Sequence, residues 1–217
     1  YRVSITNSDW LGEETKAKAL EKLSKFTPMI GYTERWRDYT AFDVHADAGL
    51  VANMQAAALY EWGFQLSKAG KPVDKGEWLM NPQTVNAYYE PSMNVIVFPA
   101  AILQPPFFNP DAEDAANYGG IGAVIGHEMT HGYDDQGARF GPTGNMEDWW
   151  TPADKKNFEG LTGKLVKQFD QYKVDGQAVN GHLTLGENIA DLGGLATAYD
   201  ALQKASAGKE DPKVDGF

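Results

Sequence analysis

The stretch VIGHEMTHGYDD, residues 124–135, constrains the fold of this chain more than any other part of it. It places His127 and His131 four positions apart, which in an α-helix is about one turn along the same face. Apolar residues dominate the positions before the histidines, as on the buried face of a helix. We therefore predict a buried helix over about residues 114–134 that presents two imidazoles to one point.

Glu128 lies directly after the first histidine and is rotated by about 100° around the predicted helix. Two imidazoles at this spacing can bind one zinc ion, which takes neutral imidazole nitrogen as a ligand. Glu128 would then miss the metal but reach a water molecule beside it and take its proton. This arrangement is the chemical content of the HExxH motif. The alternative is a buried helix whose two histidines are hydrogen-bonded core residues.

The chain has no cysteine, so any metal ion must be held by His, Asp or Glu side chains. A second predicted helix, residues 185–204, carries Glu187 and Asp191 four positions apart. Glu187 can act as a third ligand, and Asp191 can hydrogen-bond a ligating histidine, for which we expect His127. The alternative is an acidic face in solvent. Against full exposure we count the apolar neighbours Ile189, Ala190, Leu192 and Leu195.

Four further polar residues receive simpler predictions. His45 and His182 have no partner at a ligand spacing, and we expect no metal role for them. Asp134 and Asp135 follow the histidine motif directly. We expect them to face solvent, with support of the site as the alternative.

The remaining patterns predict an α+β, mainly helical fold with a small sheet. We expect further helices over about residues 8–26, 47–70 and 152–172, and two short strands within residues 84–102. We divide the 217 residues into a helical lead-in, about 1–75, and a zinc-binding core, 76–217.

Charge and hydropathy exclude several classes of partner. The net charge of −11 repels a phosphate backbone, so we expect no nucleic acid partner. The chain has no apolar run long enough to predict a transmembrane segment. It begins with Tyr1 and not with Met, which suggests an excised or processed piece of a longer polypeptide.

Three stretches together resemble the neprilysin and endothelin-converting-enzyme family of zinc metallopeptidases. They are VNAYYEPSMNVIVFPAAILQPPFF, YGGIGAVIGHEMTHGYDDQG and LTLGENIADLGGL. The resemblance implies a zincin-like (gluzincin) catalytic core that binds one Zn²⁺ ion. It implies that His127, His131 and Glu187 are the zinc ligands, that Glu128 is the general base, and that Asp191 supports a ligand histidine.

The resemblance also implies substrate contacts. Asn86 and Ala87 match strand residues that hydrogen-bond the substrate backbone. An apolar pocket for the residue after the scissile bond would be lined by Ile102, Phe107, Ala123 and Val124. Relatives often carry a bulkier residue at the position of Ala123, so we expect a roomier pocket here. Ala123→Met should then reduce cleavage before Phe or Leu.

Two departures from the family pattern limit what this chain does alone. Family members carry a C-terminal His that stabilises the oxyanion and an Arg that anchors substrate, and a large helical lobe over the site. These lie outside the present residues, so we expect an endopeptidase core for oligopeptides that turns over slowly without the remaining segments of the same polypeptide. The alternatives are a thermolysin-type secreted protease and a zinc-binding fragment without turnover. Lack of cysteine favours an exported bacterial enzyme, whether periplasmic, secreted or surface-anchored.

Overall fold

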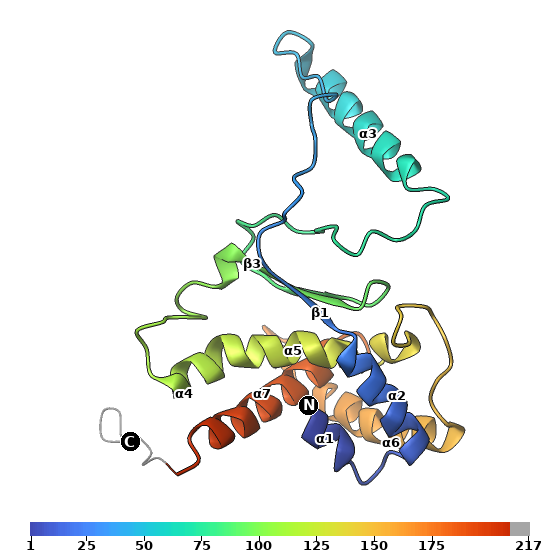
Figure 1. The fold of residues 1–217 in the computed structure, drawn as a ribbon, viewed down its shortest axis with the longest axis vertical. Helices are drawn as coiled ribbons and strands as arrows, with labels where there is room; N and C mark the ends of the chain where they lie inside the picture. The colour runs from blue at the N-terminus through green and yellow to red at the C-terminus, as the bar shows by residue number, and fades with distance from the viewer. Residues whose placement is uncertain (209–217) are drawn as a thin grey trace. The chain divides into compact units, whose positions relative to one another are not determined.

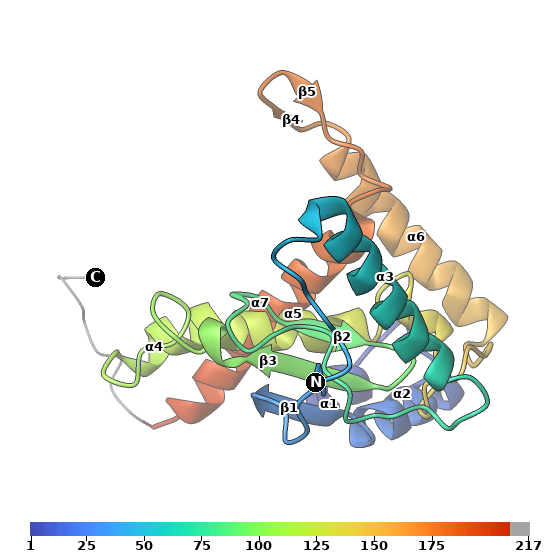
Figure 2. The same ribbon diagram turned by 90° about the horizontal axis from the view of Figure 1, so that it is seen from above.

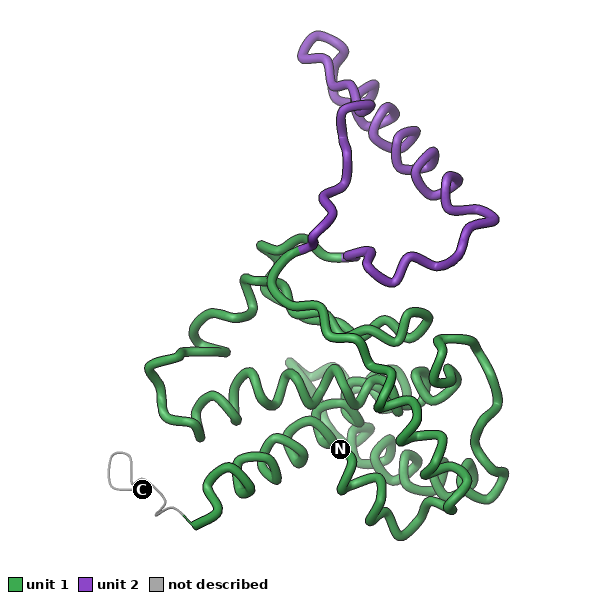
Figure 3. The backbone as a smooth tube through the Cα atoms, viewed as in Figure 1, with its two compact units in different colours: residues 1–32, 80–217 green, residues 33–79 purple. Residues whose placement is uncertain are grey.

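The computed structural model describes residues 1–208. The chain divides into two compact units, which Figure 3 draws in different colours. The larger unit combines residues 1–32 with residues from 80 onwards, and the smaller unit contains residues 33–79. The first 32 residues of the predicted lead-in thus share a unit with the predicted core.

The larger unit is mainly helical, as predicted (Figure 1). Its helical segments are α1 (Arg2–Thr6), α2 (Glu13–Ser24), η1 (Ala100–Ile102), α4 (Asp114–Asn117), η2 (Tyr118–Gly122), α5 (Ala123–His131), η3 (Gly137–Arg139), α6 (Pro152–Phe169) and α7 (Leu185–Ala205). A two-stranded ribbon of β4 (Lys173–Val174) and β5 (Gln177–Ala178) lies in the connection from α6 to α7 (Figure 2).

Asp154 ties α2 to the start of α6. Its carboxylate accepts hydrogen bonds from the Gly12 N–H at 2.9 Å and from the Thr15 hydroxyl at 2.6 Å. Thr151 caps α6 by accepting from the backbone N–H of Asp154, which confirms the predicted helix start. Because Gly12 is held in an extended conformation by this contact, α2 begins at Glu13 and not near residue 8.

A three-stranded sheet confirms the predicted strand pair and adds one strand. β2 (Tyr88–Glu90) pairs antiparallel with β3 (Val95–Pro99), whose five residues are all buried. β1 (Thr27–Gly31) pairs with the other side of β3 in parallel, a pairing that local sequence did not predict. The strand order β1-β3-β2 leaves β2 at an edge of this sheet.

The predicted helix at residues 114–134 is divided into α4, the π-helical segment η2 and α5. Within η2 the N–H of Ile121 donates to the Phe107 carbonyl at 2.7 Å, outside the helix. A side chain at Gly120 would meet that carbonyl at 2.5 Å, so glycine permits the contact. The helix therefore widens where an external acceptor replaces an internal one. It also ends at His131, three residues before the predicted end.

Helix α5 lies between the sheet and α7 (Figure 1). The two helices touch through glycine. An added Cβ at Gly194 of α7 would lie 2.5 Å from the backbone nitrogen of His127. An added Cβ at Gly126 of α5 would lie 2.6 Å from the Gly194 carbonyl oxygen. This close approach brings the histidine motif of α5 next to the acidic residues of α7.

The smaller unit contains α3 (Gly49–Ser67), which confirms the helix predicted at residues 47–70. Large apolar side chains stay exposed along it, namely Leu50, Val51, Met54, Leu59, Trp62 and Leu66. Arg37 lies over the Phe64 ring at 3.8 Å and forms an ion pair with Glu61. Within residues 1–208, no helix is both long and apolar enough to cross a membrane.

Candidate metal centre

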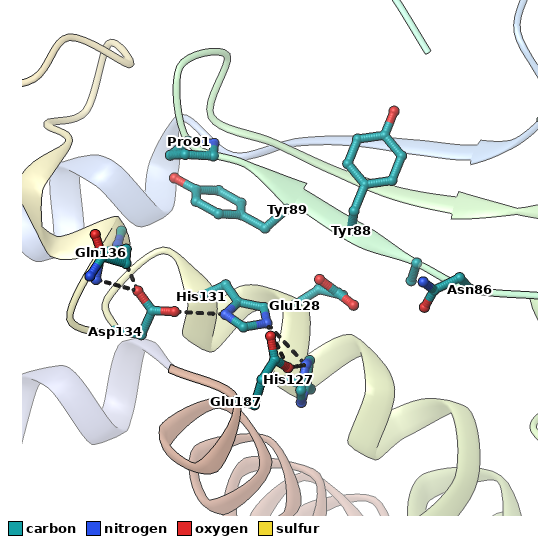
Figure 4. Close-up of a pocket in the computed structure, with 12 residues that line it drawn as sticks. Asn86, Tyr88, Tyr89, Pro91, His127, Glu128, His131, Asp134, Gln136 and Glu187 are labelled. Atoms are coloured by element: carbon teal, nitrogen blue, oxygen red, sulfur yellow. Dashed lines mark hydrogen bonds and ion pairs between the residues drawn. The ribbon is translucent and has the colours of Figure 1, made fainter. Parts of the chain in front are cut away.

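Three donor atoms from α5 and α7 meet at one point (Figure 4). The Nε2 atoms of His127 and His131 are 3.0 Å apart. Oε2 of Glu187 lies 3.2 Å from Nε2 of His127 and 3.6 Å from Nε2 of His131. The i, i+4 spacing on α5 and the glycine contact with α7 produce this convergence.

The donor set fits a zinc ion. Zinc binds histidine nitrogen and carboxylate oxygen at about 2.0–2.2 Å in a tetrahedral arrangement, in which neighbouring ligand atoms are about 3.3 Å apart. The three separations in this site, 3.0, 3.2 and 3.6 Å, bracket that value. Three protein ligands leave a fourth position for water or substrate, as in catalytic zinc sites.

Each of the two histidines pairs its other ring nitrogen with an aspartate. Nδ1 of His127 is 2.8 Å from Oδ1 of Asp191, and Nδ1 of His131 is 2.7 Å from Oδ2 of Asp134. A carboxylate is an acceptor only, so each neutral imidazole keeps its proton on Nδ1 and leaves the Nε2 lone pair free. This is the protonation state that metal binding requires. Asp191 therefore lies where we predicted.

The prediction that Asp134 faces solvent is wrong. Asp134 is only 5% exposed, and its Oδ1 accepts hydrogen bonds from the backbone N–H groups of Gln136 and Gly137 at 2.9 and 2.6 Å. The chain folds back after α5 and turns the carboxylate toward His131. Its position three residues after a histidine was the one sequence signal that could have indicated this contact.

The acidic residues of α7 are more exposed than we predicted. The side chain of Glu187 is 68% exposed and that of Asp191 is 79% exposed. Their apolar neighbours Leu192 and Leu195 do not shield them, because these side chains are themselves 65% and 60% exposed. The face of α7 that carries these groups is open in this structure.

Glu128 is the buried carboxylate of the site. It is 5% exposed and lies between α5 and β2 (Figure 4). Burial raises the pKa of its carboxyl group, and the nearby charge of Glu187 acts in the same direction. Positive charge on His131 and His127 and a backbone hydrogen bond with Tyr89 oppose that rise. A carboxylate with a raised pKa can take up a proton from water and give it up again.

A cavity of about 370 Å³ lies over these residues. Its walls come from α5, α7, the turn after α5, the β2 edge and the two residues Asn86 and Ala87. Ala87 is buried, and the side chain of Asn86 is exposed. Sequence reasoning did not identify five other lining residues, which are Tyr88, Tyr89, Pro91, Gln136 and Gly137. The tyrosines follow Asn86 and Ala87 directly in the sequence, which was the available signal.

The four predicted residues of an apolar pocket are not in the lining of this cavity. Ile102 is 3% exposed and belongs to a core cluster that includes Ile121. Phe107 and Val124 pack against the same cluster, and Ala123 is the first residue of α5. His45 and His182 are exposed, and His45 pairs with Asp43 at 2.9 Å.

Comparison with known proteins supports the same interpretation. A sequence model described as peptidase family M13 matches residues 86–217. Neprilysin-3 of Drosophila melanogaster is 39% identical over 222 residues, which cover 99% of this chain and 28% of that protein. Endothelin-converting enzyme 1 of Mus musculus is 40% identical over 214 residues, 94% of this chain and 27% of that protein.

A crystal structure of Mycobacterium tuberculosis zinc metalloprotease ZMP1 in complex with an inhibitor has the same fold, with a TM-score of 0.95 and 49% identity. The match covers all of this chain and 34% of ZMP1. The chain thus spans roughly a third of the length of its relatives or less. The fold is the mainly helical zincin-like fold with a small sheet that we predicted. The chain belongs to peptidase family M13.

Proposed function

We propose that this chain is the zinc-binding core of an endopeptidase that hydrolyses peptide bonds of oligopeptides. The observation that carries the proposal is the convergence of His127, His131 and Glu187, whose donor atoms all lie within 4.8 Å of one another. The buried carboxylate of Glu128 lies in the same cavity. Three ligands beside a base make up the machinery of metal-assisted hydrolysis.

His127, His131 and Glu187 would hold one zinc ion. Bound zinc supplies a Lewis acid, which lowers the pKa of a water molecule and polarises a carbonyl. Asp191 and Asp134 would keep each imidazole proton on Nδ1 and fix the direction of each ring. These two carboxylates therefore act through the histidines.

Glu128 would act as the general base and then as the general acid. Its carboxylate takes a proton from the attacking water and delivers it to the leaving amine. Burial supports this role, because a raised pKa brings the carboxyl group closer to the range in which both transfers are possible.

The β2 edge would hold the substrate. An extended peptide can add to an exposed strand edge through backbone hydrogen bonds. Asn86 and Ala87 border the cavity at the start of this edge, which would place a peptide bond beside Glu128. We keep both residues as substrate-binding candidates.

We propose that cleavage occurs on the N-terminal side of large apolar residues. Ile102, Phe107, Ala123 and Val124 remain the candidates for the pocket that receives this side chain. Ala123→Met would fill part of the pocket and reduce cleavage before Phe or Leu relative to cleavage before Ala. Unchanged selectivity between these peptides would contradict the assignment.

The second candidate function is a zinc-binding fragment without turnover on its own. The exposure of the Glu187 and Asp191 side chains, 68% and 79%, favours this candidate, because few neighbouring groups fix the position of an exposed side chain. Membership of family M13 argues against the thermolysin-type alternative. The remaining segments of the same longer polypeptide would complete the site. We place the whole protein outside the cytoplasm of a bacterium, as an exported enzyme.

The test is zinc content together with peptide hydrolysis, for residues 1–217 and for the longer polypeptide, each with and without Glu128→Gln. We expect one zinc per chain in all four samples. Hydrolysis should fall by about 10²–10⁴-fold in both Glu128→Gln samples, as for loss of a general base. A folded sample without zinc would contradict the ligand assignment. Undiminished hydrolysis by Glu128→Gln would contradict the role of Glu128.

A further inference from the structure

Lys22 of α2 is a buried cation outside the set of metal ligands. Its side chain has 0% exposure. Its Nζ donates hydrogen bonds to the carbonyl oxygens of Gly132, Gly137 and Phe140 at 2.6, 2.8 and 2.6 Å. An ammonium group has three N–H donors, so all three are used. The three acceptors lie 110–118 residues further along the chain.

Those three carbonyls enclose the turn that carries Asp134. Gly132 lies just before it, and Gly137 and Phe140 lie just after it. The carboxylate of Asp134 accepts from the N–H of Gly137 and contacts Nδ1 of His131. The ammonium group therefore holds the backbone on both sides of the residue that orients His131.

The backbone of Lys22 is also tied to the sheet. Asn94 donates through Nδ2 to the Lys22 carbonyl at 3.2 Å and to the Pro142 carbonyl at 3.4 Å. The Tyr89 hydroxyl donates to Oδ1 of Asn94 at 2.9 Å. Tyr89 lies on β2 and lines the cavity, so one connected set of hydrogen bonds joins α2, the turn after α5 and the substrate-facing strand.

Keeping this charge in the interior is unfavourable. Burial lowers the pKa of the Lys22 ammonium group to about 7, although the charges of Asp134 and Glu147 act in the opposite direction. The rings of Tyr89, Tyr133 and Trp149 lie 5.6–5.9 Å from Nζ and add weak attraction. An apolar residue of similar volume would avoid the desolvation but would leave three carbonyls without a donor.

We propose that Lys22 is a positioning residue for the metal centre, which fixes the turn at residues 132–140 and so holds Asp134 against His131. The inference rests on the proposed zinc site, but it does not require peptide hydrolysis. A role confined to stability makes a different prediction. Replacement of Lys22 would then lower the melting temperature and leave the zinc affinity of the folded protein unchanged.

The experiment measures zinc affinity by chelator competition on the full chain, well below the melting temperature of each variant. We expect Lys22→Met and Asp134→Asn each to weaken zinc binding by about 10–100-fold, as for loss of a group that supports a ligand. The zinc affinity of the double variant should lie within about twofold of that of whichever single variant has the lower affinity, because both changes release the same contact. If the fold-losses of zinc affinity in the two single variants multiply in the double variant, the proposal is wrong.

Thr15→Val is the matched control. Thr15 lies on α2, is also 0% exposed, and bonds Asp154 of α6 and not the turn after α5. It should lower the melting temperature and keep zinc affinity within about twofold of the parent. The same pattern in Lys22→Met would overturn the proposal. If Lys22→Met does not fold, Lys22→Gln keeps amide donors at this site and takes its place.

The imidazole tautomer of His131 separates this proposal from the proposed function. In the metal-free protein, at a pH well above the pKa of His131, ¹⁵N NMR should find the proton on Nδ1 in the parent and in Thr15→Val, and a mixture of tautomers in the Lys22 variant. That result supports the positioning role even if the parent fails to bind zinc. An unchanged tautomer in the Lys22 variant would contradict it.

Discussion

The candidate metal centre contains two histidine–aspartate pairs that have the same chemistry but different surroundings. His131 and Asp134 are 2.7 Å apart, and the Asp134 side chain is 6% exposed. His127 and Asp191 are 2.8 Å apart, and the Asp191 side chain is 79% exposed. The lengths are nearly equal, so distance alone does not reveal how firmly each pair is held.

The difference lies in what holds each carboxylate. Asp134 accepts two backbone hydrogen bonds in a turn whose Gly137 carbonyl accepts a hydrogen bond from the buried Lys22 side chain. Asp191 stands on the open face of α7, where water competes for the carboxylate and salt screens its charge. The carboxylate of Asp134 is thus held in place by the surrounding backbone, whereas the place of the Asp191 carboxylate depends on the position of α7.

The largest expected effect comes from separating the two halves. Gly194→Ala would put a Cβ 2.5 Å from the backbone nitrogen of His127, so α5 and α7 must move apart. We expect a loss of about 3 kcal/mol in unfolding free energy and zinc binding at least about 100-fold weaker. Thermal unfolding and chelator competition measure both.

Gly163→Ala is the control for this substitution. Gly163 lies in α6, and among residues 1–208 no atom outside the nearby turns of that helix lies within 4 Å of an added Cβ. It should raise stability by about 0.5–1 kcal/mol through the lower entropy of the unfolded chain. If Gly194→Ala behaves like this control, the close contact does not position the site.

The next effect distinguishes the two aspartates. Asp134→Asn should lower the unfolding free energy of the metal-free protein by about 1–2 kcal/mol, because a buried charge-assisted hydrogen bond is lost. Asp191→Asn should change it by less than about 0.5 kcal/mol, as expected for an exposed pair. Urea unfolding measures both values. Equal losses would show that exposure does not separate the two pairs.

The buried pair also predicts a pH dependence in the protein freed of metal by a chelator. Burial lowers the pKa of His131, but the hydrogen bond and charge of Asp134, together with the charges of Glu187 and Glu128, outweigh it, so the net pKa lies above 6.5. The folded state then binds this proton more tightly than the unfolded state. The resulting stability is fully present below about pH 6.5 and is lost as pH rises through the folded pKa.

An NMR titration of the His131 ring measures this shift directly. The midpoint should lie above 6.5 in the parent and move down in Asp134→Asn. If Asp134→Asn leaves the midpoint unchanged, the shift comes from other charges near the ring, of which Glu187 and Glu128 are the candidates.

The smallest effect concerns salt. Raising the ionic strength from about 0.05 to 0.5 M shortens the screening length from about 14 to 4 Å. The effect of Asp191→Asn on zinc affinity should shrink at high salt, whereas that of Asp134→Asn should persist. Parallel chelator titrations at the two ionic strengths provide the measurement. Equal sensitivity in both variants would remove the distinction between an open and a buried pair.

Much of this site could be predicted from local spacing. The i, i+4 pairs His127–His131 and Glu187–Asp191 lie on helices whose period sets which side chains share a face. Their separation in the folded molecule agrees with that expectation. The start of α6 and the two strands β2 and β3 were also predictable, because each depends on neighbours within a few residues.

Several features had no local signal. The prediction for Asp134 was wrong because its burial depends on how the turn after α5 folds back, and that turn is held by a lysine 110 residues or more away. The expected shielding of Glu187 and Asp191 was wrong because apolar neighbours along a helix can point to an open face. The division of helix 114–134 depends on the Phe107 carbonyl, which the helix does not contain.

The amino-acid sequence by itself determined which groups the candidate site contains, namely two imidazoles, a neighbouring carboxylate and a third carboxylate on helices. Helix geometry is local, so the relative positions of the side chains on each helix are the same in any fold that contains the two helices. Only the tertiary structure decided how α5 and α7 meet at Gly126 and Gly194, and which of the two aspartates is buried. Those outcomes depend on contacts between residues far apart in the chain, where packing selects one arrangement among many.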